Sequence, residues 1–583
     1  MSTQSEQSAA AFLEVASQFK LGSLVTEASH PVTSNLSETA RESVAEGLRQ
    51  LFAVDRDVVL TFSRFVASGR AEGLSSRIAQ AVHRGGRLIF TGCGSTGRLS
   101  ILLASMWRSF FAQRGLSDLE GRAFAVMAGG DFALIKSVEG FEDFTQFGRR
   151  QIADLGVGPR DMVFAITEGG ETSFVIGTAW EALEKGADVV FVYNNPDDVL
   201  VATVARSREI IADRRIEKLE LTTGPMAISG STRMQATTIE LAVVSTVLEM
   251  AVRRLLGLPW ADVPERFLAG LEALSERLLD DALIEPLARV VEMEEEIYRH
   301  GGRVSYFADS LGLDVLTDTT ERSQTYCTPP YRRFDDTSAA ESWSFLYLPC
   351  PDSASAWRHI LKRDPSCVDW SPDVVASLAP SGAAARTNEI VGRIGVADLM
   401  KFRIGLDGLG DRPPRPGDGA VGIYGEADAG AFQTAQLDRA RDAGVRAAAI
   451  VLGEAPRPGI DAVVTLEVPK VDLLLDGLAR AGVKMLLNAL STCTMVRLGR
   501  VMGNTMVWVV PSNLKLIDRS TRYIVRLTGL DYEPACRLLH EVIEYVQPRM
   551  LADQAYPPVV GMAVIRHREG LTNEEAEERL LRA

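Results

Sequence analysis

The stretch RLIFTGCGSTGRLS, residues 87–100, joins a short apolar run, a glycine-rich turn and the start of a helical pattern. Its glycines have the spacing G-x-G-x-x-G that is typical of dinucleotide-binding loops. Ser95 and Thr96 stand side by side in the same turn, where hydroxyl groups suit a single phosphate. The stretch therefore predicts a strand-turn-helix unit of an α/β fold and raises a choice between two kinds of phosphate loop.

Strand-like and helical segments alternate from this stretch onward. The strand-like runs of the first half are RLIFTG, RAFAVMAGG, DMVFAITEGG and DVVFVYNN. Between them lie segments such as SFVIGTAWEALEKG, in which apolar residues recur at helical spacing. This alternation predicts a doubly wound α/β architecture, with a parallel sheet covered by helices on both faces.

A weaker copy of the pattern follows a long helical stretch at roughly 232–300. Its strand candidates are RVSYFADS, SFLYLPC, GAVGIYGEA, AAAIVLGE and AVVTLEV, and from about residue 481 the pattern is helical to the end. We therefore expect two α/β domains between an N-terminal helical segment and a helical C-terminal cap. In chain order these four parts are residues 1–60, 61–275, 276–480 and 481–583.

Charge and composition restrict the partners. Lys and Arg number 62 against 77 Asp and Glu, and the formal charge of −15 argues against nucleic acid or an anionic membrane as partner. We expect no signal peptide and no membrane span, since the N-terminus lacks a basic region before an apolar core and no run of about 18 apolar residues occurs. The six scattered cysteines and six scattered histidines favour reduced thiols in a cytoplasmic protein with no metal or other cofactor.

Three loops rich in Gly, Ser and Thr stand where a strand gives way to a helix: TGCGSTGR, ITEGGETSF and TTGPMAISGSTRMQATT. Open parallel sheets bind ligands outside the carboxyl ends of their strands. Each loop offers unpaired N–H groups and hydroxyl donors, so together they predict one shared phosphate site. Taken singly, each is equally well explained as a helix cap. A fourth loop, AGGDFALIKSVEGFEDF, carries Glu139, Glu142 and Asp143.

The dinucleotide alternative has weaker support. It requires an acidic residue at the end of the strand after the glycine loop, to bind a ribose hydroxyl. The strand candidate RAFAVM is followed by AGG and only then by Asp131, which stands late for that role. We therefore interpret residues 87–100 as one wall of a monophosphate site.

Several long motifs in a fixed order resemble those of one known family. GCGSTGRLSILLAS, AGGDFALIKSVEGFED, ITEGGETSFVIG and SGSTRM are similar to the sugar isomerase (SIS) domain of the N-acetylmuramic acid 6-phosphate etherases and of the animal glucokinase regulatory proteins. The likeness extends upstream to TEASHPVTSNLSE and downstream to the stretch from VKMLLNALST to VRLTGL. About 250 residues separate Ser231 from Lys484, a layout that resembles the regulatory proteins, with two SIS domains and a helical lid.

The resemblance implies a sugar 6-phosphate as the ligand of the first domain. Glu139 matches the base of the etherases, and Glu142 matches a nearby acid that binds the sugar. Lys484 matches a lysine that reaches in from the C-terminal region. The residues that match the sugar- and phosphate-binding loops are Ser95, Thr96, Thr167, Gly169, Thr172, Ser231 and Thr232.

Two segments of the second half are interpreted through the same family. The stretch LTDTTERSQTYCTPPYRRFDD, residues 316–336, would pack toward the first-domain site and bring Glu321, Gln324 and Tyr326 near the sugar. The alternative for it is a surface loop. The loop IYGEADAGAF lacks a cluster of Ser and Thr, so we expect the second domain to be structural rather than a second binding site.

Some positions depart from the etherase pattern. The family's general acid lies in a motif like GRLGILDASE, whereas GRLSILLASM places Leu103 and Met106 at the acidic positions. A thioether has no proton to donate, and loss of a general acid typically removes about 10²–10⁴ in rate. Glu171 and Gln235 also differ from the family, and Glu171 with Glu168 places two carboxylates near the expected phosphate. The departures indicate a ligand other than N-acetylmuramic acid 6-phosphate, unless Glu142 or Tyr326 donates the proton instead.

Two functions are compatible with these residues. The first is a lyase or aldose–ketose isomerase in which Glu139 moves a proton next to the sugar carbonyl. The second is a non-catalytic phosphosugar sensor that regulates a sugar kinase, which the two-domain layout and the absent acid favour. Retention of Glu139 and Glu142 favours the enzyme. The identity of the sugar, and whether the chain forms a homo-oligomer, stay open.

Overall fold

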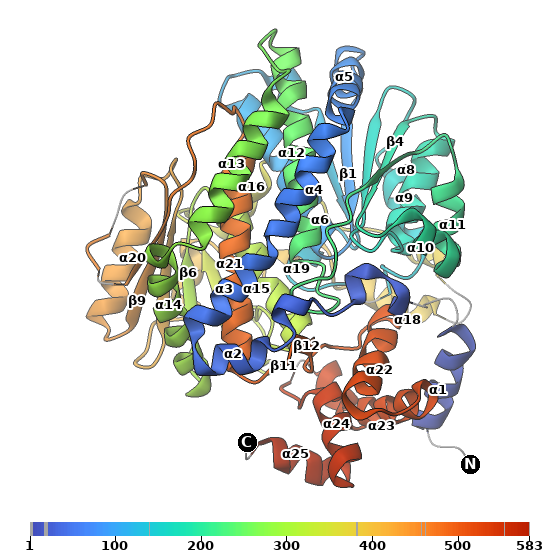
Figure 1. The fold of residues 1–583 in the computed structure, drawn as a ribbon, viewed down its shortest axis with the longest axis vertical. Helices are drawn as coiled ribbons and strands as arrows, with labels where there is room; N and C mark the ends of the chain where they lie inside the picture. Colours follow the sequence, from blue (N-terminus) through green and yellow to red (C-terminus); the bar gives the residue numbers. More distant parts are fainter. Residues whose placement is uncertain are drawn as a thin grey trace.

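Two parallel sheets lie on either side of a long buried helix in the computed structural model (Figure 1). The structure describes residues 4–16, 21–138, 140–379, 383–455, 458–460, 462–552 and 554–581.

The first sheet has five parallel strands in the order β2-β1-β3-β4-β5. They are β1 (Leu88–Gly92), β2 (Ala123–Met127), β3 (Met162–Ile166), β4 (Asp188–Tyr193) and β5 (Glu217–Glu220). β1 and β3 are buried at every position, as expected for apolar runs in the middle of a parallel sheet. Because β2 lies beside one edge of β1 and β3 beside the other, the winding reverses between β1 and β3, which makes this the switch point where ligands bind.

The second sheet repeats this topology. Its strands are β6 (Val304–Phe307), β7 (Ser344–Tyr347), β8 (Gly419–Tyr424), β9 (Arg446–Leu452) and β10 (Val463–Leu466), in the order β10-β9-β8-β6-β7. Numbered from its own first strand and read from β7, this order is again 2-1-3-4-5. The chain therefore contains two copies of one doubly wound unit.

Helices cover both sheets. Before the first sheet come α1 (Gln4–Val15), α2 (Leu36–Glu42), α3 (Val44–Val54), α4 (Arg56–Ala67) and α5 (Arg70–His83). Between its strands lie α6 (Ser95–Ala112), α7 (Ser117–Glu120), α8 (Thr145–Asp154), α9 (Ser173–Glu184), α10 (Asp197–Thr203) and α11 (Ala205–Ala212). The second unit has α15 (Gly312–Tyr326), α16 (Ser353–Leu361), α17 (Pro372–Leu378), α18 (Ala384–Val391), α19 (Val396–Leu399) and α20 (Ala431–Asp442). The 3-10 helices are η2 (Leu21–Ser23), η3 (Val25–Glu27), η4 (Pro31–Thr33), η5 (Asp131–Leu134) and η6 (Leu406–Asp411).

Four long helices form the centre of the molecule. α12 (Gln235–Leu255), α13 (Val263–Leu278) and α14 (Asp281–Arg299) connect the sheets, and α21 (Gly477–Arg497) packs against all three. α12 is buried on nearly all sides, and its buried residues include the charged side chains of Glu240, Glu249 and Arg253 among apolar ones. Within the described ranges it is the one helix whose length and hydropathy would also suit a membrane span, and that apolar stretch lies entirely inside the protein.

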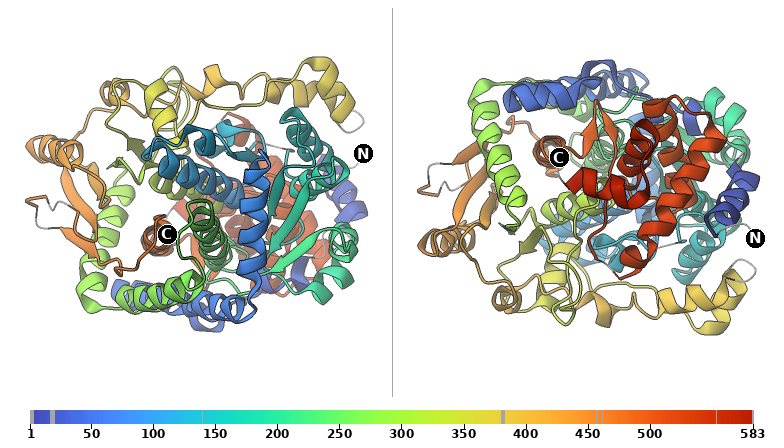
Figure 2. Two further views of the ribbon diagram at one scale, coloured as in Figure 1. Left: turned by 90° about the horizontal axis from the view of Figure 1, so that it is seen from above. Right: turned by 90° about the horizontal axis from the view of Figure 1, so that it is seen from below.

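The C-terminal part is a hairpin followed by four helices. The hairpin pairs β11 (Val501–Met502) with β12 (Thr505–Met506), and the helices are α22 (Leu514–Thr528), α23 (Tyr532–Leu551), α24 (Val559–Glu569) and α25 (Asn573–Leu581). α1 packs against α23, so both ends of the chain lie at the same end of the molecule (Figure 1). Seen from below in Figure 2, the red C-terminal helices lie over the first unit.

The predicted α/β class, with two doubly wound parallel sheets and C-terminal helices, is confirmed. Each predicted strand coincides with a strand of the structure. β5 was missed because its sequence, EKLE, is charged, as an edge strand with one buried residue allows. The boundary expected at residue 481 falls inside α21, which lies in the core and not in the cap.

Candidate active site

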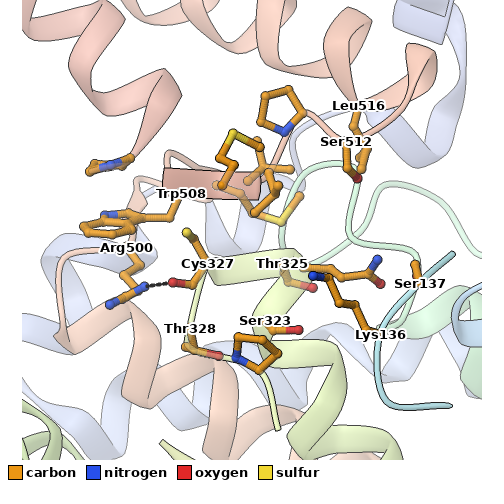
Figure 3. Close-up of a pocket in the computed structure, with 18 of the residues that line it drawn as sticks. Lys136, Ser137, Ser323, Thr325, Cys327, Thr328, Arg500, Trp508, Ser512 and Leu516 are labelled. Atoms are coloured by element: carbon orange, nitrogen blue, oxygen red, sulfur yellow. Dashed lines mark hydrogen bonds between the residues drawn. The ribbon is translucent and has the colours of Figure 1, made fainter. Parts of the chain in front are cut away.

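A cavity of about 1100 Å³ lies beyond the carboxyl ends of β1 and β3, at the switch point of the first sheet. The C-terminal segment around Ser512 and Leu516 covers one side of it, and the end of α15 with residues 327–330 covers another (Figure 3). In the same view, Arg500 lies beneath Trp508 and donates to the Cys327 carbonyl. Parts of the chain from both units therefore enclose one site.

The glycine loop after β1 forms the first wall. Ser95, the first residue of α6, lines the cavity. Thr96 does not: its Oγ1 accepts from the Cys93 N–H at 3.1 Å and donates to the Cys93 carbonyl at 2.9 Å, which fixes the turn. Gly92 is required by packing, because a Cβ there would lie 2.3 Å from the carbonyl carbon of Thr96. The glycine spacing of this loop thus has a structural reason besides ligand binding.

The loop after β3 forms the second wall. Thr172 lines the cavity directly before α9, where free helix N–H groups are found. Thr167 lies behind it and donates from Oγ1 to Thr172 Oγ1 at 3.1 Å. The Gly169 carbonyl accepts from Asn195 Nδ2 at 3.0 Å. Of these three predicted ligands, Thr172 reaches the cavity, while Thr167 and Gly169 hold the loop in place.

The loop before α12 forms the third wall. Ser231, Thr232 and Arg233 line the cavity. The Arg233 guanidinium is buried, donates to Ser491 and Thr492 on α21 at 3.1 Å each, and stands 3.4 Å from Asp318. It is fixed by neighbours on two helices rather than extended toward solvent.

Lys484 supports this third loop from beneath. Its Nζ donates to the carbonyls of Arg233 at 2.6 Å and Met234 at 3.1 Å, and to Thr238 Oγ1 at 2.9 Å. Burial lowers the pKa of Lys484 to about 8, against the charge of Glu321, which acts to raise it. Lys484 is not among the residues that line the cavity. The lysine that the resemblance brings to the ligand therefore binds the backbone of the ligand loop.

The acidic loop meets the C-terminal helices. Glu139 lies outside the described residues. Glu142 lines the cavity and accepts from Asn513 Nδ2 at 2.8 Å, with Lys515 Nζ at 3.4 Å. Lys515 also pairs with Glu171 at 2.7 Å, and Arg206 lies on the other side of that carboxylate. Burial acts to raise the pKa of Glu171, but the charges of Lys515 and Arg206 outweigh this effect and hold the pKa at about 2.

Glu168 is the most buried carboxyl group on the cavity wall. It lies two residues after the end of β3, is 6% exposed, and lines the cavity together with Ser95 and Thr172. Its Oε1 lies 3.4 Å from Thr237 Oγ1. Burial raises the pKa of Glu168 to about 7, and the charge of Lys515 only partly opposes this. The sequence showed this residue only as one of two carboxylates near the expected phosphate.

The first half of the stretch 316–336 is helix, and the second half, from residue 327 on, is loop. α15 ends at Tyr326, and its last turn brings Gln324 to the cavity with Ser323 and Thr325. Glu321 lies behind the wall, with Oε2 3.8 Å from Arg233, and it does not line the cavity. Tyr326 donates to Thr492 on α21 at 3.2 Å. One of the three residues expected near the sugar therefore borders the cavity.

Sequence reasoning missed the contributions of the C-terminal segment. Lys515 and Asn513 belong to the stretch PSNLKLIDRS, whose likeness to the family's C-terminal helices indicates no role for either side chain. The N-terminal segment TEASHPVTSNLSE also has a function here, because the Gly230 N–H donates to the Thr26 carbonyl and Ser229 Oγ donates to the Glu27 carbonyl. Both segments fix the ligand loops from far away in the sequence.

Asp131 and the residue types that bind metals bear on two other ligand classes, dinucleotides and metal ions. Asp131, considered for a ribose hydroxyl, is bound by Arg363 at 2.8 Å and by the Ser366 N–H at 2.5 Å. Over the part of the chain that the structure describes, no three His, Cys, Asp or Glu side chains gather as a metal site.

A parallel sheet of order 2-1-3-4-5, with hydroxyl-bearing loops that line one cavity at its switch point, fits the class of sugar isomerase (SIS) domain proteins. The family model described as the glucokinase regulatory protein N-terminal SIS domain matches residues 72–182. The N-acetylmuramic acid 6-phosphate etherase of Deinococcus radiodurans is 33% identical over 262 residues, which cover 44% of this chain and 78% of that protein. The etherase of Caldanaerobacter subterraneus subsp. tengcongensis is 31% identical over 257 residues, 44% of this chain and 77% of its own.

The chain belongs to the SIS family, in the group of the N-acetylmuramic acid 6-phosphate etherases and glucokinase regulatory proteins. Among solved structures, the tagatose-6-phosphate ketose/aldose isomerase of Escherichia coli is 10% identical and has a TM-score of 0.44, with 81% of this chain and 98% of that chain covered.

Proposed function

We propose that this protein binds a sugar 6-phosphate in the cavity of its first unit and acts on it as a lyase of the etherase type or as an aldose–ketose isomerase. One observation carries the proposal: the loops after β1 and β3, the loop before α12 and the acidic loop after β2 all line a single cavity. The etherase relatives, whose name includes a sugar 6-phosphate, support it.

The phosphate would lie among Ser95, Thr172, Ser231 and Thr232. The first two stand at the N-termini of α6 and α9, where backbone N–H groups and the positive end of the helix dipole favour an anion. This arrangement suits an acidic protein, because it binds an anion with local N–H and O–H donors rather than with net positive charge.

Glu139 would act as the base, as the resemblance implies. Val138 and Gly140, which flank it in the sequence, both line the cavity. A carboxylate that removes the proton next to the carbonyl of the open-chain sugar can start either elimination or isomerisation, and donors around the developing enediolate would stabilise it.

We further propose a cytoplasmic location.

Exchange of the sugar C2 proton in heavy water tests the catalytic proposal. Over a panel of hexose and hexosamine 6-phosphates, the wild type should exchange this proton with at least one sugar. Glu139→Gln should exchange it at least about 100-fold more slowly, the usual effect of removing a general base. Thermal shift with the same panel provides the control for binding. Binding without exchange by the wild type would contradict the enzyme proposal.

A second candidate is a phosphosugar sensor that regulates a sugar kinase. The match to the glucokinase regulatory protein SIS model favours it, as does the apolar pair Leu103 and Met106 at the family's acidic positions. This candidate requires stoichiometric phosphosugar binding without turnover and a change in the activity of a sugar kinase from the same cell. If no sugar kinase responds, this candidate is wrong.

A further inference from the structure

The helix that holds the family's proton donor offers none here. Leu103 and Met106 on α6 are both buried among apolar neighbours, at 0% and 2% exposure. Neither side chain carries a proton that an ether oxygen could take. Cleavage of an unactivated ether by elimination therefore needs an acid from another element.

Glu168 is a carboxyl group placed for that role. It stands at the carboxyl end of β3, beside the switch point, and lines the same cavity as Ser95, Thr172 and Glu142. Its contact with Thr237 is long, at 3.4 Å, and the Thr237 hydroxyl donates more closely to the Thr232 carbonyl, at 2.9 Å. Its own backbone N–H also acts on the carboxyl group and favours the ionised form, but burial outweighs this effect.

The charges around Glu168 favour its protonated form. Lys515, the cation that acts on it, is already paired with Glu142 and Glu171. Three carboxyl groups face it from other elements: Glu142 from the acidic loop, Glu321 from α15 and Glu240 from α12. The other titratable groups near it are Lys484 and Cys93. Like charges and burial both disfavour a second negative charge here.

We propose that Glu168 is the proton donor of the reaction and replaces the acid that α6 lacks; this inference rests on the proposed function. In elimination from a 3-O-substituted sugar 6-phosphate, the base takes the C2 proton. The C2–H electron pair forms the C2=C3 double bond, and the C3–O bond breaks. The ether oxygen keeps that bond's electron pair and takes the proton of Glu168. An alcohol leaves, an unsaturated sugar phosphate stays, and Glu168 becomes a carboxylate that water reprotonates.

Leaving groups of different basicity test this role in the full-length protein. The probes are N-acetylmuramic acid 6-phosphate, whose lactate oxygen needs a proton, and its analogue with fluorine at C3, whose fluoride leaves without one. Glu168→Gln should release lactate about 100-fold or more slowly than the wild type, as expected for a lost general acid. It should release fluoride within about threefold of the wild type and keep C2 proton exchange.

Glu577→Gln is the matched control, since it makes the same change at another carboxyl group that lines the cavity, one that pairs with Arg549 on α23. It should leave the ratio of lactate to fluoride release unchanged. The wild-type rate of lactate release should fall at alkaline pH, and Glu168→Gln should lose this dependence. Equal slowing of both leaving groups in Glu168→Gln would overturn the role of Glu168 alone, whereas a wild type that releases neither product would contradict the lyase form of the proposed function.

Discussion

Lys484 illustrates how a single side chain can serve a binding site without touching the ligand. All three of its hydrogen bonds go to the third ligand loop and the start of α12. The loop carbonyls of Arg233 and Met234 have this ammonium group as a donor in a buried place, and a buried polar group without a partner costs free energy.

Lys484→Met is therefore expected to lower the free energy of unfolding by about 1.5–3 kcal/mol, because it removes the charged donor from two carbonyls that would keep only Asn488 Nδ2 and Thr238 Oγ1 as side-chain donors. Urea denaturation measures the change. Lys470→Met serves as the control, since Lys470 is 79% exposed and pairs only with the equally exposed Glu454. A surface pair of that kind contributes little. Equal stability of Lys484→Met and the wild type would show that the loop does not depend on this lysine.

Glu168 should also affect stability in a pH-dependent way. Burial raises its pKa from 4.5 to about 7, so the folded state binds the proton more tightly than the unfolded state. The contribution of protonated Glu168 to the free energy of unfolding is fully present below about pH 4.5 and is lost as the pH rises through about 7. As the pH rises from about 4.5 to about 7, the free energy of unfolding of Glu168→Gln should therefore increase relative to that of the wild type by on the order of 3 kcal/mol. Denaturation at both ends of this range measures the gain; a constant difference would contradict the shifted pKa.

At the scale of elements, α22 is held against the first unit by buried charges. Arg519 donates to Glu27 at 2.6 and 3.0 Å, and both side chains are at most 8% exposed. Lys515 and Asn513 add contacts to the acidic loop. The apolar face of a helix can be predicted from its sequence pattern, but these polar contacts join residues between 371 and 492 positions apart.

Arg519→Met is expected to release α22 from the cavity. Removal of one partner from a buried ion pair leaves Glu27 charged and unpaired, which costs about 3–5 kcal/mol. Hydrogen exchange followed by mass spectrometry should show faster exchange in 514–528 and in the segment around Glu27. Arg537→Met, which breaks an exposed pair with Glu533 on α23, should leave both segments unchanged. If α22 keeps its protection in Arg519→Met, the ion pair does not hold it.

At the scale of the whole molecule, the two units are joined by buried polar contacts as well as by packing. Asp131 after β2 accepts from Arg363 and from the Ser366 N–H of the second unit. Asp131→Asn should lower the unfolding free energy by about 2–3 kcal/mol, since hydrogen bonds to charged groups are stronger than neutral ones. Phosphosugar affinity, measured by titration calorimetry, should stay the same. The exposed Asp364→Asn, which loses only a surface pair with Arg358, is the control.

A change in phosphosugar affinity in Asp131→Asn would place this residue in the site and not at the junction of the units. If a dinucleotide raises the melting temperature of the wild type but not that of Asp131→Asn, the dinucleotide interpretation is supported again.

The sequence predicted those parts of the fold that depend on local pattern. Apolar runs such as MVFAI and AAAIVL identified the strands, and the Gly/Ser/Thr loops identified three walls of the cavity. It could not predict the charged edge strand β5, which has little apolar pattern of its own. Nor could it separate ligand from support: Ser95 and Thr96 are neighbours, yet one lines the cavity and the other binds its own turn. That difference arises only from the direction of each side chain.

The pairing of Glu27 with Arg519 has a consequence for folding of the chain during its synthesis on the ribosome. Glu27 has no access to this partner until Arg519, 492 residues later, has been synthesised. The first sheet can form as soon as its strands emerge, since domains generally fold as units during synthesis. Its hydroxyl loops, however, meet their closing helix only after α22 has emerged, so a nascent chain that ends before α22 carries an open and incomplete pocket.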